Sequence, residues 1–178
     1  SCDLTHRFVK RVGSEGRVVS VDVSRPMLQR GKNRMIDTGM IRNVAYVLSD
    51  AQNLAFADQQ FDCVSIGFGL RNVTRIQSAL GSMFRMLRPG GRIVVLEFSH
   101  PPSKFLSRLY DRYSFSVIPR IGRAVTGDER SYRYLVESIR QHPDQEALRK
   151  MMGEAGFEDV HYHNLSGGIV AIHVGFRY

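Results

Sequence analysis

The sequence is poor in cysteine, since Cys2 and Cys63 are its only two and stand far apart. So few thiols exclude a disulfide framework or a cysteine-ligated zinc site, and they favour a reducing compartment. Long apolar runs are missing as well. The longest, such as residues 91–98 and 167–176, are far shorter than the ~20 residues of a membrane-spanning helix. We therefore expect no transmembrane helix, and the start of the sequence shows no signal-peptide pattern.

Acidic residues are in the minority, with 17 against 25 lysines and arginines, for a formal net charge of +8. This excess favours an anionic partner, either nucleic acid or an acidic membrane surface. The basic residues are dispersed, and no run of them is typical of a nucleic-acid-binding tail. Internal repeats, low-complexity linkers and a G-x-G-x-x-G motif are also absent from the sequence.

Helical and strand-like patterns alternate over residues 3–98. We expect helices at 3–12, 24–39 and 76–87, and strands at 17–22, 44–50, 61–68 and 92–98. Short connections between them favour βαβ units and a parallel sheet. The nearly continuous apolar run at residues 61–68 predicts a strand that is buried on both faces.

The pattern changes after residue 98. Residues 100–130 have no clear strand, several aromatic residues and interrupting prolines, which predicts an inserted helical cover. Pro143 and Asp144 mark the start of a further helix that ends at Gly156. Residues 157–164 and 169–176 predict a closing β-hairpin. The length predicts one domain over residues 1–178.

Two of the predicted strands end in an acid, at the edge where open α/β sheets bind ligands. Asp22 is placed to accept both hydroxyls of a ribose. Asp50, followed by the small Ala51, is placed to accept from an exocyclic adenine amine. Asp22 would serve equally well as a strand-end or helix-capping acid. Met27 is placed to contact the adenine, although a methionine at helical spacing is more often core.

The strand at residues 61–68 changes abruptly from apolar to polar at its end. Gly67 and Gly69 allow another molecule to approach the backbone closely, and Arg71 and Asn72 follow. We expect these residues, the two acids and the Pro-Gly-Gly turn near residue 90 along one sheet edge, as an adenosyl cofactor requires. The closing antiparallel strand favours S-adenosylmethionine over a dinucleotide.

Blocks of the sequence resemble the C-methyltransferases of ubiquinone and menaquinone biosynthesis. FGLRNV, YDRYSF and SYRYLVESI are specific to that family, whereas DAQNL and PGG are common among methyltransferases. The resemblance runs from about Asp3 to the end of the chain. It implies an α/β class I methyltransferase (Rossmann-like) fold with an antiparallel C-terminal hairpin. It also implies S-adenosyl-L-methionine as the cofactor, and methylation of a ring carbon of a polyprenyl benzoquinol or demethylmenaquinol.

The family carries a first strand and a GGTGD-like loop ahead of the region that matches. Here the sequence begins with Ser1-Cys2-Asp3, with Ser-Cys where the family has Thr-Gly. We therefore expect an N-terminally truncated domain without the first strand. By the same resemblance, Ser1 is expected at the methionine end of the cofactor. The strands on either side of the missing one, 17–22 and 61–68, should then not pair.

Position and resemblance together place Arg71 and Asn72 at the acceptor ring, with Tyr110 and Tyr113 of the cover as further catalytic candidates. In the alternative, Arg71 pairs with a structural acid and the tyrosines only pack. An aromatic, basic cover suits a polyprenyl tail and peripheral contact with an anionic bilayer. A homodimer or a quinone-biosynthesis complex is a further expected partner. The expected location is the bacterial cytoplasm at the inner membrane, or the matrix side in a mitochondrion.

Other functions compatible with the pattern are a methyltransferase on RNA or another small molecule, and a non-catalytic scaffold. The charge permits RNA, but residues 68–72 lack the Asn/Asp-Pro-Pro-Tyr exit of amino-nitrogen methyltransferases. We therefore expect no nucleic-acid partner. We also expect no metal, because no histidines show the pairing of metal ligands. Surface or strand positions are predicted for His6, His142, His161, His163 and His173.

Overall fold

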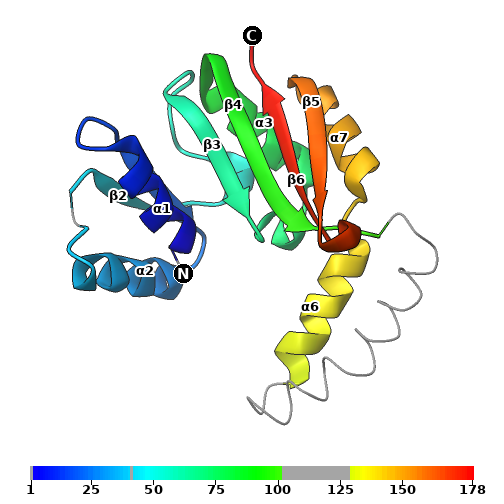
Figure 1. Ribbon diagram of the computed structural model, residues 1–178, viewed down its shortest axis with the longest axis horizontal. Helices are drawn as coiled ribbons and strands as arrows, with labels where there is room; N and C mark the ends of the chain where they lie inside the picture. Colours follow the sequence, from blue (N-terminus) through cyan, green and yellow to red (C-terminus); the bar gives the residue numbers. More distant parts are fainter. Residues whose placement is uncertain (1, 41, 102–128) are drawn as a thin grey trace. The chain divides into compact units, whose positions relative to one another are not determined.

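The computed structural model (Figure 1) describes residues 2–40, 42–101 and 129–178. It contains two compact units, Ser1–Ala55 and Phe56–Tyr178. None of the helices in these ranges has both the length and the apolar content that crossing a bilayer requires. The single domain over residues 1–178 stays a prediction, and nearly all of the expected cover at residues 100–130 lies outside the described residues.

The first unit is a two-stranded parallel sheet with two helices. Its elements are α1 (Asp3–Val12), β1 (Val18–Asp22), α2 (Arg25–Asp37), β2 (Val44–Leu48) and the 3-10 turn η1 (Ala51–Asn53). α1 packs against β1, and α2 packs against both strands. Ser24 caps α2, because its Oγ accepts a hydrogen bond from the backbone N of Met27 at 3.4 Å.

The second unit is a four-stranded mixed sheet. Its elements are β3 (Phe61–Gly67), η2 (Leu70–Asn72), α3 (Ile76–Met86), β4 (Leu87–Phe98), α6 (Glu129–Gln141), α7 (Gln145–Glu154), β5 (Glu158–Leu165), η3 (Ser166–Gly168) and β6 (Val170–Phe176). The strand order is β3-β4-β6-β5. β3 and β4 run parallel, whereas β6 is antiparallel to both of its neighbours. The predicted hairpin is therefore confirmed, with its second strand inserted next to β4.

The core of this unit lies between the sheet and two helices. α3 and α7 pack side by side on one face of the sheet, as Figure 1 shows. Alternate residues of β4 face them, and Ile93 and Val95 are fully buried. Gly156, with φ 103°, ends α7 where the ring of Phe84 comes within 3.0 Å of the position that a Cβ would occupy. A larger residue would not fit there, so the close packing of α3 on α7 depends on this glycine.

β3 is less buried than predicted. It is the edge strand of its sheet, and Cys63 is exposed. The prediction of burial on both faces was wrong, because an apolar run cannot show which other elements cover the two faces of a strand. The expected lack of pairing between the strands at residues 17–22 and 61–68 stays a prediction.

The turn at residues 88–91 also differs from the prediction. It forms a bulge in β4, because Phe61 pairs with Leu87 whereas Cys63 pairs with Arg92. Gly67 pairs with Leu96 at the other end of the two strands. The Pro-Gly-Gly turn therefore lies at the amino ends of the strands and not at the ligand edge. The reason is topological, because the chain that enters a parallel strand from a preceding helix must do so at the amino edge.

Candidate active site

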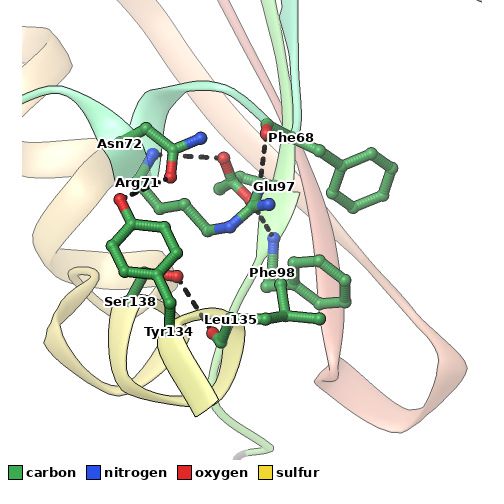
Figure 2. Close-up of polar contacts among 8 residues, drawn as sticks. All are labelled: Phe68, Arg71, Asn72, Glu97, Phe98, Tyr134, Leu135 and Ser138. Carbon is green, nitrogen blue, oxygen red and sulfur yellow. Dashed lines mark hydrogen bonds and ion pairs between the residues drawn. The ribbon is translucent and has the colours of Figure 1, made fainter. Parts of the chain in front are cut away.

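The turn η2 places Arg71 and Asn72 at the carboxyl end of β3, as the sequence predicts. Leu70, the first residue of the turn, is completely buried and anchors it. The neighbouring strand β4 ends at Phe98, and Gly67 pairs with Leu96. Glu97 therefore lies beside the turn, and Figure 2 shows its carboxylate directed toward Arg71.

Glu97 holds Arg71 by both its backbone and its side chain. Glu97 Oε1 accepts from Arg71 Nη1 at 3.0 Å, and Glu97 Oε2 accepts from the backbone N of Arg71 at 3.2 Å. The backbone N of Phe98 donates to Glu97 Oε1 at 2.9 Å. The side chain of Glu97 is only 2% exposed and that of Arg71 only 12%. The pairing of Arg71 with a structural acid, left open by the sequence, is thus present.

Sequence reasoning missed Glu97. Its signal was an acid inside the apolar run of the strand at residues 92–98. A buried carboxylate requires a partner because its desolvation is expensive. An acid in such a run therefore indicates a buried cation nearby.

An aromatic pair supports the other side of the guanidinium. Arg71 Cζ lies 5.3 Å from the centroid of the Phe98 ring, within the range of a cation–π contact. The Phe98 ring in turn lies 4.9 Å from that of Phe68. Phe68 has φ 53°, a left-handed conformation that is rare for a bulky residue. Arg71 Nη1 also donates to the carbonyl oxygen of Phe68, so the irregular backbone there helps to hold the guanidinium.

Asn72 receives a hydrogen bond from α6. Tyr134 Oη donates to Asn72 Oδ1 at 3.1 Å, as seen in Figure 2. Because the bond uses the amide oxygen, it directs the two N–H donors of Asn72 to other partners. Tyr134 is 56% exposed. Sequence reasoning missed it, since the expected cover ended at residue 130, although Tyr134 lies in the family-specific block SYRYLVESI. Tyr110 and Tyr113 lie outside the described residues.

A buried group of polar side chains follows β4. His100 Nε2 lies 3.0 Å from the carbonyl oxygen of His142. Gln145 Nε2 donates to the backbone carbonyl oxygen of His100 at 2.9 Å. The backbone carbonyl oxygen of Gln145 lies 2.9 Å from His173 Nε2. His142 is 4% exposed, and neither of its ring nitrogens has a hydrogen-bond partner among the described residues. These contacts join the end of β4 to the start of α7 and to β6.

The predicted positions of the histidines are only partly right. His161 and His163 are exposed in β5, as expected. His142, however, lies in neither a strand nor the surface, and His173 in β6 is 1% exposed. The physical reason for His173 is that α7 packs against β5 and β6.

Burial lowers the pKa of His142 from 6.5 to about 4, and the nearby His100, His173 and Arg71 add to this effect. Between these two pH values the unfolded chain binds the proton and the folded chain does not. Stability is therefore fully present above pH 6.5 and declines as the pH falls toward 4. We expect a loss of about 2 kcal/mol in unfolding free energy between pH 7.5 and pH 5 from this residue.

Urea unfolding at the two pH values will measure this loss. His142→Leu should reduce the pH dependence by that amount, whereas His163→Gln, at an exposed position, should retain it. An unchanged pH dependence in His142→Leu would show that the ring is protonated in the folded protein.

In the first unit, Asp22 and Asp50 follow adjacent parallel strands and so share one sheet edge, since Asp22 pairs with Leu48. Asp22 Oδ1 accepts from the backbone N of Ser24 at 2.8 Å, and Asp50 Oδ1 from that of Gln52 at 2.9 Å. Asp50 therefore caps η1, whereas Asp22 is a strand-end acid that accepts from the residue capping α2. Their shared edge is the placement that a nucleoside requires.

The remaining cofactor candidates are distributed over both units. Met27 lies in the first turn of α2 and is 39% exposed, so it is a surface residue and not part of the core. Ala51 begins η1. In the second unit, Gly67 is the last residue of β3. Ser1 lies outside the described residues.

Comparisons with known protein sequences match one methyltransferase family. The family model of the ubiE/COQ5 methyltransferase family matches residues 1–177. Pseudomonas aeruginosa has a protein named ubiquinone/menaquinone biosynthesis C-methyltransferase UbiE that is 55% identical over 175 residues, covering 98% of this chain and 68% of the relative. The protein of that name from Yersinia enterocolitica is 54% identical over 176 residues, covering 99% and 70%.

Solved structures show the fold. A SAM-dependent methyltransferase from Aquifex aeolicus has a TM-score of 0.66 at 13% identity, covering 98% of this chain and 76% of that one. A putative methyltransferase from Bacillus halodurans has a TM-score of 0.64 at 16% identity, with both chains covered completely. The likeness confirms the predicted class I methyltransferase fold.

Proposed function

Since the chain belongs to the ubiE/COQ5 methyltransferase family, we propose that it methylates a ring carbon of a polyprenyl benzoquinol or demethylmenaquinol. It is a methyltransferase that uses S-adenosyl-L-methionine. The observation that carries the proposal is the 55% identity over 98% of the chain to proteins named for this reaction. Nothing in these matches favours an RNA methyltransferase or a non-catalytic scaffold.

The cofactor would be held at the carboxyl ends of the strands. Asp22 is proposed to bind the ribose hydroxyls, and Asp50 with Ala51 to bind the adenine. The exposed Met27 would contact the adenine ring. Gly67 and Ser1 are proposed for the methionine end. The shared edge of β1 and β2 supports the first two assignments.

S-adenosylmethionine supplies an electrophilic methyl group on a sulfonium. The acceptor carbon becomes nucleophilic when a neighbouring quinol hydroxyl loses its proton. When bound, the cofactor would supply this methyl group to the ring carbon as its carbon–sulfur bond breaks, and that carbon would then release its proton to water. Arg71 cannot serve as a base, because a guanidinium keeps its proton. It is proposed to stabilise the phenolate oxygen, while Asn72 donates a hydrogen bond. Tyr110 and Tyr113 remain candidates for lining the ring.

The proposal also covers the membrane contact, the location and the partners of the protein. The net charge of +8 supports peripheral contact with the anionic headgroups of a bilayer, in whose hydrocarbon interior polyprenyl quinols dissolve. We propose a cytoplasmic location at the inner membrane of a bacterium, or the matrix side of a mitochondrion. A homodimer or a complex of quinone biosynthesis enzymes is part of the same proposal, and a nucleic-acid partner is not.

The test is methyl transfer to a short-tailed demethylquinol in the presence of S-adenosylmethionine with an isotopically labelled methyl group. We expect the label on a ring carbon, and one S-adenosylhomocysteine for each product. The matched control is the oxidised quinone, which has no hydroxyl to ionise and should not react. Label on oxygen, or no transfer to the quinol at all, would contradict the proposal.

A further inference from the structure

We propose that Glu97 is the positioning residue of this methyl transfer, because it fixes the guanidinium of Arg71 at the acceptor site. The inference rests on the function proposed for Arg71. Glu97 would not contact the substrate, and its effect would pass entirely through Arg71.

The contacts are those of a holding group. Glu97 uses separate oxygens for the backbone N and the Nη1 of Arg71, at 3.2 and 3.0 Å. It thereby fixes the turn η2 and the guanidinium with one carboxylate. The Phe98 ring, 5.3 Å from Arg71 Cζ, restricts the guanidinium from another side. Arg71 Nε has no partner among the described residues.

The burial of Glu97 indicates that the ion pair has a role beyond stabilising the fold. A carboxylate with 2% exposure loses nearly all of its hydration, and an apolar residue would fill the same space at lower cost. What an apolar residue cannot do is hold a cation in one orientation. The two charges together form a fixed ion pair at the end of β3, where the oxygen of the acceptor ring is expected.

Removing the carboxylate of Glu97 should change the reaction rate in opposite directions, depending on whether its charge or its positioning of Arg71 matters more. A negative charge beside a developing phenolate opposes it, so on charge alone Glu97→Gln should speed the reaction. If Glu97 positions Arg71, the same substitution should slow the reaction, because a misplaced donor loses its effect on the transition state. The sign of the change therefore separates the two roles.

The experiment compares Glu97→Gln with the wild type on a short-tailed demethylquinol. We expect kcat to fall about tenfold, with an unchanged KM for S-adenosylmethionine. In an Arg71→Ala background, Glu97→Gln should have no further effect on kcat, because the group that it holds is gone. Asp62→Asn is the matched control, since it breaks the exposed Arg88–Asp62 pair at the amino end of β3.

Glu97→Asp keeps the experiment decisive if Glu97→Gln does not fold. It retains the charge but withdraws the carboxylate, so it should restore the fold without restoring kcat. Full kcat in Glu97→Asp, higher kcat in Glu97→Gln, or an additive loss with Arg71→Ala would each overturn the inference. If the wild type transfers no methyl group to the quinol, the proposed function itself fails.

Discussion

Arg71→Ala is expected to lower turnover on a short-tailed quinol by about 10²–10³-fold, the usual cost of removing one preorganised donor from such a site. The affinity for S-adenosylmethionine should stay near that of the wild type. The guanidinium lies at the exit of β3, buried to 12% exposure and fixed by Glu97. It is therefore oriented before the substrate arrives, and its contribution belongs to the transition state and not to cofactor binding.

Steady-state kinetics with calorimetry of cofactor binding will separate the two effects. Arg88→Ala is a matched control, because it removes an exposed arginine that also pairs with an acid, Asp62. It should leave turnover unchanged. If Arg71→Ala turns over the quinol at the wild-type rate, Arg71 is only a structural partner of Glu97.

Asp22→Ala should weaken the binding of S-adenosylmethionine by about 1.5–3 kcal/mol, the range for hydrogen bonds to a charged group. This corresponds to roughly a 10- to 150-fold higher Kd. The reason is the loss of the acceptor proposed for the ribose hydroxyls. Isothermal titration calorimetry measures the change directly, and unchanged affinity would contradict the assignment.

One complication is that Asp22 Oδ1 also accepts from the backbone N of Ser24 at 2.8 Å. Alanine removes this bond together with the ribose contact. Asp22→Asn is the sharper variant, since its amide oxygen can keep the bond to Ser24 while the negative charge is lost. It should also bind the cofactor more weakly. Asp37→Ala, at an exposed position of the same unit, should bind normally.

The sequence predicted those parts of the fold that have local signals. Helices begin next to Ser24 and Asp144 as expected, and the side chains of these two residues cap them. The closing hairpin follows from two alternating runs that are separated by a turn. The polar exit at Arg71 and Asn72 was found in the same way, because a change from apolar to polar residues can be seen within a few positions.

Features that depend on distant pairing were not predicted. Cys63 was expected to be buried but is exposed, because distant parts of the chain decide which faces of a strand are covered. The contacts of Glu97 and Tyr134 join residues from separate elements, so no local spacing could show them. The burial of His142 likewise depends on helices that lie far from β4 in the sequence. Pairs of this kind can be found only by asking which hydrogen-bond partner each buried polar group has.

The Arg71–Glu97 pair has a consequence for how the protein folds. Its two residues are 26 positions apart, and the chain between them consists mainly of α3 and most of β4. One strand–helix–strand crossover thus contains both charges. The loop that their contact closes is short, so the conformational entropy lost on closing it is small. The pair needs only this one crossover, whereas the pairing of β4 with β6 needs the chain as far as residue 176. The acceptor end of the site can therefore be assembled before the C-terminal hairpin has found its place in the sheet.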